Sequence, residues 1–230
     1  MPKRMTLEEF ERAFQSLRNQ GWVRSCRRGP TGIGHTLEKY IGLQENNIAL
    51  PDLDKAELKA HRANCASMIT LFTFNRKAWI MRPLDAIRKF GTHDMNGRLG
   101  LYSTTSLTPN SLDLFLHVDT ESLFLRHVSG EVIAKWTFSA LEQQFERKLP
   151  AMLLVSAFSE MRGDVEYLRF DRAQLLSGSN PCIIRNQILA GNVLVDLRLY
   201  DKTTRARNHG TGFRTREDRL PLLFENVKEL

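Results

Sequence analysis

An acidic stretch at residues 51–59, with the sequence PDLDKAELK, carries the clearest pattern in the chain. Polar and apolar residues alternate in its second half, which predicts a strand with Glu57 and Lys59 on one face and Leu58 pointing into the core. Asp52 stands just before this strand, so a turn can bring its carboxylate beside Glu57. The pattern therefore predicts that two carboxylates and a lysine meet at one point.

Such a cluster fits phosphodiester hydrolysis with one or two Mg²⁺ ions. Carboxylates and the backbone carbonyl of Leu58 are hard oxygen ligands, and a bound cation polarises the phosphate and stabilises the leaving oxygen. Lys59 can orient the attacking water and offset charge in the transition state. The spacing matches the PD-(D/E)xK pattern, with Asp54 interpreted as a turn residue. A Glu-x-Lys pair is also common on solvated strands, so the pair alone does not establish catalysis. The surrounding sequence has to distinguish a catalytic pair from an ordinary surface pair.

Two basic segments flank this cluster along the chain. Residues 24–34 are rich in glycine and arginine but lack the Gly-Lys-Ser/Thr ending of a nucleotide-binding loop, which predicts a flexible loop beside a phosphate backbone. Residues 202–219 hold six arginines and lysines and a histidine against two acidic residues. Arginine pairs with the O6 and N7 atoms of guanine, which favours a GC-rich target. The predicted base contacts are Arg207, His209, Arg214 and Arg216, the alternative being a solvated loop that contacts only phosphates.

The composition agrees with a polyanionic partner. The 230 residues carry a net charge of +7, and 42% of them are hydrophobic, enough for a substantial core. No apolar run is long enough to cross a membrane, and the N-terminus lacks the apolar core of a secretion signal. The three cysteines are far apart and lack C-x-x-C spacing. We therefore expect a cytoplasmic protein with neither a disulfide framework nor a zinc site.

Several of these segments together resemble the MvaI/BcnI family of restriction endonucleases. The resemblance rests on the segments TGIGHTLE at 31–38, IGLQENN at 41–47, the Pro-Asp and Glu-x-Lys elements of 51–59, ITLFT at 69–73 and, less specifically, NHGTGFR at 208–214. It is sharpest over residues 29–75. Thr73 stands where part of the family has a histidine, so the target sequence stays open.

The resemblance implies an α/β (mixed α+β) fold similar to that of the nicking enzyme MutH. It implies a PD-(D/E)xK core with a mixed central sheet, flanking helices and two lobes around a DNA cleft, without a clear boundary along the chain. The catalytic lobe is expected to centre on 1–90 and the DNA-recognition lobe to lie in the C-terminal half, including 193–219. It further implies a monomer that cuts double-stranded DNA at a short CC-x-GG-type site and has a cognate DNA methyltransferase.

The resemblance also assigns roles to individual residues. Asp52, Glu57 and Lys59 would be catalytic, and Glu38 on the preceding helix would hold a second metal ion or its waters. An ordinary helix charge is the alternative for Glu38. The further DNA contacts expected from both lines of reasoning are Arg27, Arg28, Thr31 and His61, the last just past the predicted strand together with Arg62.

Two other functions remain open at this point. One is a MutH-like nicking or repair endonuclease with the same chemistry, and the other is a DNA-binding protein without catalysis. Carboxylates within a basic surface repel phosphate unless a cation lies between them, which favours an enzyme.

The rest of the chain predicts alternating helices and strands without internal repeats. Thr6 and Glu9 form a capping-box pattern that begins a helix ending near Gly21. Further helices are predicted at 35–41, 83–90, 139–148, 182–190 and 219–229, and strands at 56–60, 68–74, 112–118, 122–128, 132–138, 152–158, 165–170 and 193–200.

Overall fold

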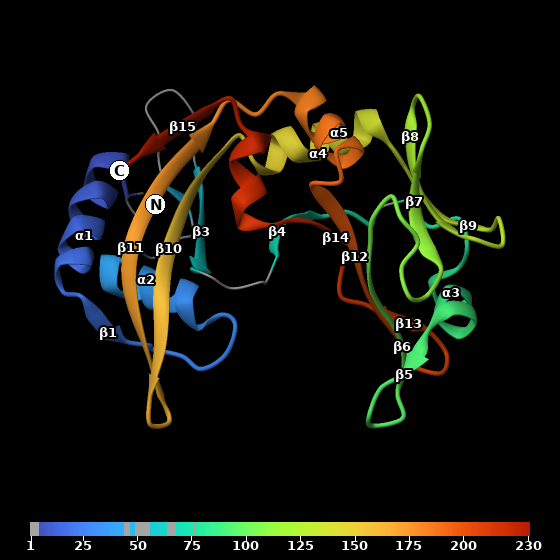
Figure 1. Cartoon of the computed structure of the whole chain (residues 1–230), viewed down its shortest axis with the longest axis horizontal. Helices are drawn as coiled ribbons and strands as arrows, with labels where there is room; N and C mark the ends of the chain where they lie inside the picture. Colours follow the sequence, from blue (N-terminus) through green and yellow to red (C-terminus); the bar gives the residue numbers. More distant parts are fainter. Residues whose placement is uncertain (1–4, 44–46, 49–55, 64–67, 76) are drawn as a thin grey trace. The chain divides into compact units, whose positions relative to one another are not determined.

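The computed structural model describes residues 5–43, 47–48, 56–63, 68–75 and 77–230. Asp52, Asp54 and the predicted turn before the catalytic strand lie outside the described residues. The chain has a mixed α/β architecture with three sheets (Figure 1). It divides into two compact units, each assembled from segments that are far apart in the sequence. None of the described helices combines the length and the apolar composition needed to cross a membrane.

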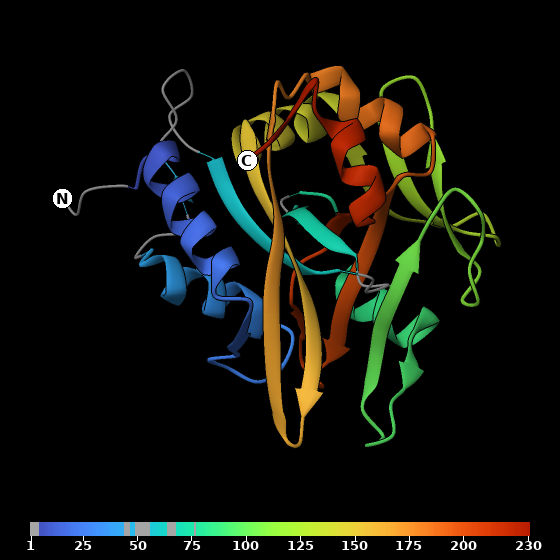
Figure 2. The same cartoon turned by 60° about the vertical axis from the view of Figure 1, so that its left-hand side comes forward.

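Unit 1 comprises residues 1–67, 149–179 and 224–230 and is built on one six-stranded sheet. The order is β1-β11-β10-β3-β2, with β15 also paired to β11, and β3 runs parallel to β10. Its strands are β1 (Trp22–Arg24), β2 (Asn47–Ile48), β3 (Ala56–Arg62), β10 (Ala151–Arg162), β11 (Val165–Ser177) and β15 (Asn226–Glu229). Helices α1 (Leu7–Asn19) and α2 (Gly32–Ile41) lie beside this sheet (Figure 2).

The core of unit 1 lies between these helices and one face of the sheet. Phe10 and Phe14 of α1 stack at 5.9 Å and join Leu37 of α2 in a buried cluster with Leu58 and Val155 of the sheet. The predicted capping box is confirmed, since the Glu9 amide donates to Thr6 Oγ1 and the Thr6 amide donates to the Glu9 carboxylate. Alternate residues of β3 and β10 enter this core, so Glu57 and Lys59 of β3 lie on the other face of the sheet beside Met152 and Leu154 of β10.

Unit 2 comprises residues 68–148 and 180–223 and contains the other two sheets. The larger has the order β4-β14-β12-β6-β5, with β13 also paired to β12, and the smaller has the order β7-β8-β9. The strands are β4 (Ile69–Thr73), β5 (Thr92–His93), β6 (Leu99–Thr105), β7 (Leu114–Val118), β8 (Ser122–His127), β9 (Val132–Thr137), β12 (Val193–Asp201), β13 (Ala206–Asn208) and β14 (Gly212–Thr215). The helices are α3 (Pro83–Phe90), α4 (Phe138–Lys148), α5 (Pro181–Leu189) and the 3₁₀ helix η1 (Glu217–Leu223).

The prediction for the last residues of the chain is wrong. The closing helix at 219–229 is instead the 3₁₀ helix η1 followed by strand β15, which pairs antiparallel with β11. Pro221 inside η1 cannot donate a backbone hydrogen bond, which disfavours an α-helix there, and the long-range pairing of Val227 with Leu176 fixes the last residues as a strand. The basic segment 202–219, for which a solvated loop was the alternative, contributes β13 and β14 to the larger sheet of unit 2.

Candidate active site and DNA-contact surfaces

Strand β3 presents Glu57 and Lys59 on the face opposite the core of unit 1. Lys59 Nζ lies 2.5 Å from Glu57 Oε1, and the two side chains are 31% and 30% exposed. Leu58 between them is buried in the core, as the alternation predicted. The strand therefore holds a carboxylate and an ammonium group side by side and open to solvent.

The pair borders an apolar strip on the neighbouring strand. In the parallel register of β3 and β10, Glu57 is opposite Met152 and Lys59 is opposite Leu154. Met152 is fully buried and Leu154 is 2% exposed. Apolar neighbours strengthen the field of nearby charges because they displace water.

A second polar group lies on this face, one strand farther on. Gln174 of β11 is opposite Leu154 and donates to Glu229 of β15 at 2.7 Å, and Arg172 also donates to Glu229. The bond from Arg172 is the main reason why the pKa of Glu229 lies below its ordinary value, and desolvation opposes it. Glu229 therefore stays ionised and ties β15 to β11.

The described donors fit a hard cation in kind, since Glu57 offers carboxylate oxygens. Among the described residues, no three His, Cys, Asp or Glu side chains gather closely enough to hold a metal ion. Asp52, the predicted second carboxylate, is outside that set. Glu38 lies on α2 and is half-buried, and within the described part of the chain no ion pair joins it to Lys59.

Hydrogen bonds and a close backbone approach hold the basic segment 24–34 in its conformation. Buried Thr36 of α2 accepts a hydrogen bond from the Cys26 amide at 2.9 Å and donates to the Gly32 carbonyl at 2.7 Å. A Cβ atom at Gly32 would lie 2.2 Å from the Arg27 carbonyl oxygen, so only glycine fits this close approach. The three predicted DNA contacts Arg27, Arg28 and Thr31 are exposed, and so are Arg24, Gly29 and Pro30 of the same segment.

Arg62 at the end of β3 anchors the same loop. Its guanidinium donates to both carboxylate oxygens of Glu166, at 2.7 and 2.9 Å, and to the carbonyls of Gly29 at 3.1 Å and Pro30 at 3.3 Å. The strand predicted at 56–60 extends to Arg62, so His61 and Arg62 lie within β3 rather than just past it, and the strand alternation places them on opposite faces. His61 shares the face of Lys59 and is 5% exposed.

We expect Arg62→Met to lower the free energy of unfolding by about 1–3 kcal/mol, because it leaves the Glu166 carboxylate without this charged donor. The side chains of Arg62 and Glu166 are only 20% and 17% exposed, so water cannot fully replace the lost bonds. Urea unfolding checks the loss, and amide exchange in residues 24–34 should speed up. A double-mutant cycle with Glu166→Gln isolates the pair, and additive effects of the two changes would contradict this anchoring role.

In unit 2, one carboxylate organises two arginines on the larger sheet. Asp196 of β12 is 8% exposed and accepts from Thr104 at 3.0 Å, from Arg198 Nε at 2.7 Å and from Arg214 Nη1 at 3.0 Å. Arg214 also donates to the Met68 carbonyl at 2.6 Å. The strand registers place Asp196, Arg198 and Arg214 on one face. Sequence reasoning missed Asp196 and Arg198, although the Asp-x-Arg spacing in a strand of alternating pattern was a usable signal.

The predicted base contacts lie close to this group. Arg207 of β13 is opposite Tyr200 of β12, and the exposed ring of His209 is 5.6 Å from the ring of Tyr200. The His209 amide donates to the Arg198 carbonyl at 2.9 Å. Arg216 follows β14 and is exposed. The structure therefore brings Arg207, His209 and Arg214 to one sheet, with Arg216 just beyond its edge.

Comparisons with known proteins agree with this architecture. The family model described as the MvaI/BcnI restriction endonuclease family matches residues 11–224. The structure is similar to one described as restriction endonuclease MvaI in complex with cognate DNA substrate, with a TM-score of 0.76, 25% identity and 97% of each chain covered. It is also similar to MvaI in the absence of DNA, with a TM-score of 0.55, 25% identity and coverage of 100% of this chain and 99% of the other.

A search of curated proteins returned no match. The family model nevertheless covers nearly the whole chain, including the strand that carries Glu57 and Lys59 and the sheet that carries Asp196. The chain belongs to the MvaI/BcnI restriction endonuclease family and is a DNA phosphodiester hydrolase.

Proposed function

We propose that the chain is a Type II restriction endonuclease that cuts both strands of DNA at a short GC-rich site of the CC-x-GG type, with Mg²⁺ as cofactor. The observation that carries the proposal is the Glu57–Lys59 pair on β3, in which a carboxylate and an ammonium group lie 2.5 Å apart beside an apolar strip. Double-stranded DNA as the substrate is supported by the similar structure of MvaI with its cognate DNA.

In this proposal, Glu57 and Asp52 would hold one or two Mg²⁺ ions together with the Leu58 carbonyl, and Glu38 would support a second ion or its waters. Mg²⁺ held there would supply polarisation of the scissile phosphate and stabilisation of the leaving oxygen. Lys59 orients the attacking water, and its ammonium group offsets the charge that builds up on the phosphate. The ion pair with Glu57 holds the Lys59 ammonium group in place until the phosphate arrives.

Recognition in this proposal comes from the larger sheet of unit 2. Arg198 and Arg214 share the Asp196 carboxylate, which uses some of their donors and leaves others for a partner. A guanidinium fixed in this way suits the paired acceptors of guanine, because its orientation is set before DNA binds. Arg207 and His209 lie on neighbouring backbone and supply further contacts. The exposed loop residues Arg27, Arg28 and Thr31 contact phosphates, and His61 supports the site next to Lys59.

The deciding experiment is incubation of the purified protein with a sequenced plasmid, with and without Mg²⁺, followed by mapping of the fragment ends. We expect discrete Mg²⁺-dependent double-strand cuts at one short GC-rich site. Nicks in one strand only would instead support a MutH-like repair role. If plasmid and DNA from several other sources stay intact with every divalent metal tested, the proposal is wrong.

The proposal carries two further expectations about the enzyme's surroundings. A host that contains such an enzyme has to protect its own sites, which calls for a cognate DNA methyltransferase of the same specificity. We also propose that the enzyme acts as a monomer, the state that the family resemblance implies.

A further inference from the structure

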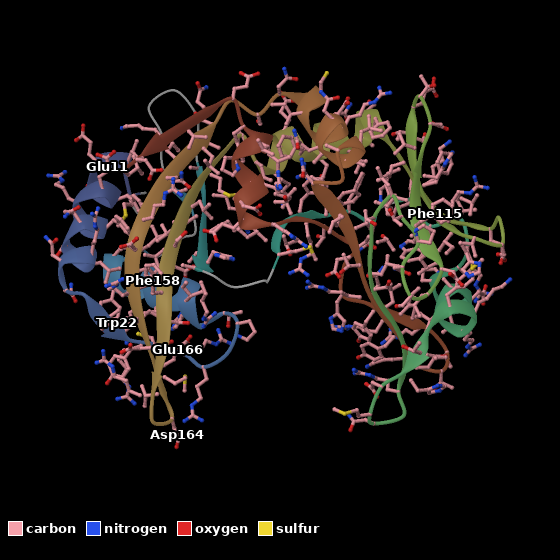
Figure 3. The ribbon with its side chains drawn as sticks, viewed as in Figure 1. Glu11, Trp22, Phe115, Phe158, Asp164 and Glu166 are labelled. Atoms are coloured by element: carbon pink, nitrogen blue, oxygen red, sulfur yellow. The ribbon has the colours of Figure 1, made fainter. Side chains whose placement is uncertain are left out.

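The face of unit 1 that carries Glu57 and Lys59 continues along β10 onto the long β10–β11 hairpin. Leu154 is opposite Lys59, and Phe158 lies four residues farther along the same strand and therefore on the same face. At the rise of an extended strand this is about 13 Å from Leu154. Figure 3 labels Phe158 and Trp22 on this part of the sheet.

Two arginines on this face each lie over two aromatic rings. The guanidinium of Arg169 lies 4.9 Å from the ring centre of Phe158 and 5.5 Å from that of Trp22. The guanidinium of Arg162 lies 5.7 Å from the ring centre of Trp22 and 4.5 Å from that of Tyr167. We call these five residues the arginine–aromatic cluster. Three strands contribute to it, because Arg169 is the register partner of both Trp22 and Phe158.

The cluster has an excess of positive charge. Arg162 pairs with Glu160 at 2.5 Å, whereas no ion pair involves Arg169 within the described part of the chain, and Arg169 is exposed. Arg24, also exposed, is opposite Tyr167 and adds a third cation to the same face. One carboxylate therefore faces three guanidinium groups.

Stacking on aromatic rings orients an arginine without using its hydrogen bonds. Within the described residues no ion pair engages Arg169, whereas Arg162 already donates Nε to Glu160, so Arg169 is the member of the cluster whose N–H groups stay available for a bidentate anion. Because the side chain is already ordered, less conformational entropy is lost when the anion binds. An oriented guanidinium with few competing carboxylates suits a phosphate group.

We propose that the arginine–aromatic cluster binds the phosphate backbone of the DNA strand next to the scissile phosphate, outside the recognised bases. This inference rests on the proposed function, since it needs DNA at Glu57 and Lys59. The spacing of about 13 Å corresponds to roughly two to four nucleotides of one strand, given about 3.4 Å of helix axis per nucleotide and a winding path. A protein partner fits less well, because the ring faces that it would pack against are covered by guanidinium groups.

The test is a salt titration of DNA binding for Arg169→Ala. The probe is a fluorescein-labelled mixed-sequence duplex of about 30 base pairs in EDTA, so that the sequence-independent phosphate contacts are measured. We expect affinity to fall about tenfold near 0.1 M salt and the slope of log K against log salt to decrease by about one. Arg18→Ala is the matched control, because it removes the same charge from α1 on the other side of the sheet and should change neither quantity.

Two further measurements separate the possible failures. Arg169→Lys keeps the charge but loses the stacked plane, so its affinity should lie between those of wild type and Arg169→Ala, and thermal unfolding verifies that each variant folds. If wild type binds and cuts DNA while Arg169→Ala matches Arg18→Ala in affinity and slope, the cluster only stabilises the hairpin and the inference is overturned. If wild type neither binds this duplex nor cuts plasmid, the proposed function itself fails.

Discussion

Replacement of Lys59 with alanine is expected to slow DNA cleavage by at least about 10²–10³-fold, the usual effect of removing one preorganised charge from a transition state. DNA affinity should stay nearly unchanged, because Lys59 is one cation among many and its charge is already paired with Glu57 at 2.5 Å. The measurement is single-turnover cleavage with saturating enzyme, so that chemistry is separated from binding. Binding to the same DNA is followed in parallel without Mg²⁺.

Lys39→Ala is the matched control for this variant. Lys39 is an exposed residue in the last turn of α2, so its loss removes the same charge from the same unit without touching β3. The control should cleave at the wild-type rate. Wild-type cleavage by Lys59→Ala would remove Lys59 from the chemistry, and a joint loss of cleavage, binding and thermal stability would show that its main role is structural.

The elements that could be predicted from the sequence are those with local causes. Helix α1 has a cap, an apolar stripe and a glycine stop within twenty residues, and each of these acts on its own neighbours. The face shared by Glu57 and Lys59 follows from the twofold alternation of a strand, which the structure confirms through buried Leu58. The predicted role of the pair rested on a pattern of nearby residues and on family resemblance.

The features that were missed depend on strands that are far apart in the sequence. Val227 and Leu176 become neighbours only through sheet pairing, and this overrides any helical tendency of the last residues. Arg62 meets Glu166 across more than a hundred residues, so neither the spacing nor the composition near Arg62 predicts the contact. Arg214 was predicted as a base contact without its carboxylate partner for the same reason.

Asp196→Asn is expected to have the second large effect, and on specificity rather than on chemistry. The change keeps the size of the side chain and the acceptor for Thr104, but it removes the charge that Arg198 and Arg214 share. The two guanidinium groups then repel each other, and their orientation is no longer set. A well-oriented arginine–guanine pair is worth about 1–3 kcal/mol of discrimination, so we expect about a 5–150-fold loss of preference for the cognate site.

The same variant should bind non-cognate DNA as well as wild type or more tightly, because its net charge rises by one. This opposite response separates an orienting role from a general loss of structure, which would weaken both kinds of binding. Asp201→Asn is the control, since it makes the same charge change on β12, where the carboxylate pairs with Arg88 instead. Competition binding with cognate duplex and a one-base-pair variant measures the preference once the site is mapped. An unchanged preference in Asp196→Asn would mean that the bases are recognised elsewhere on the protein, and that Asp196 serves only the packing of the sheet.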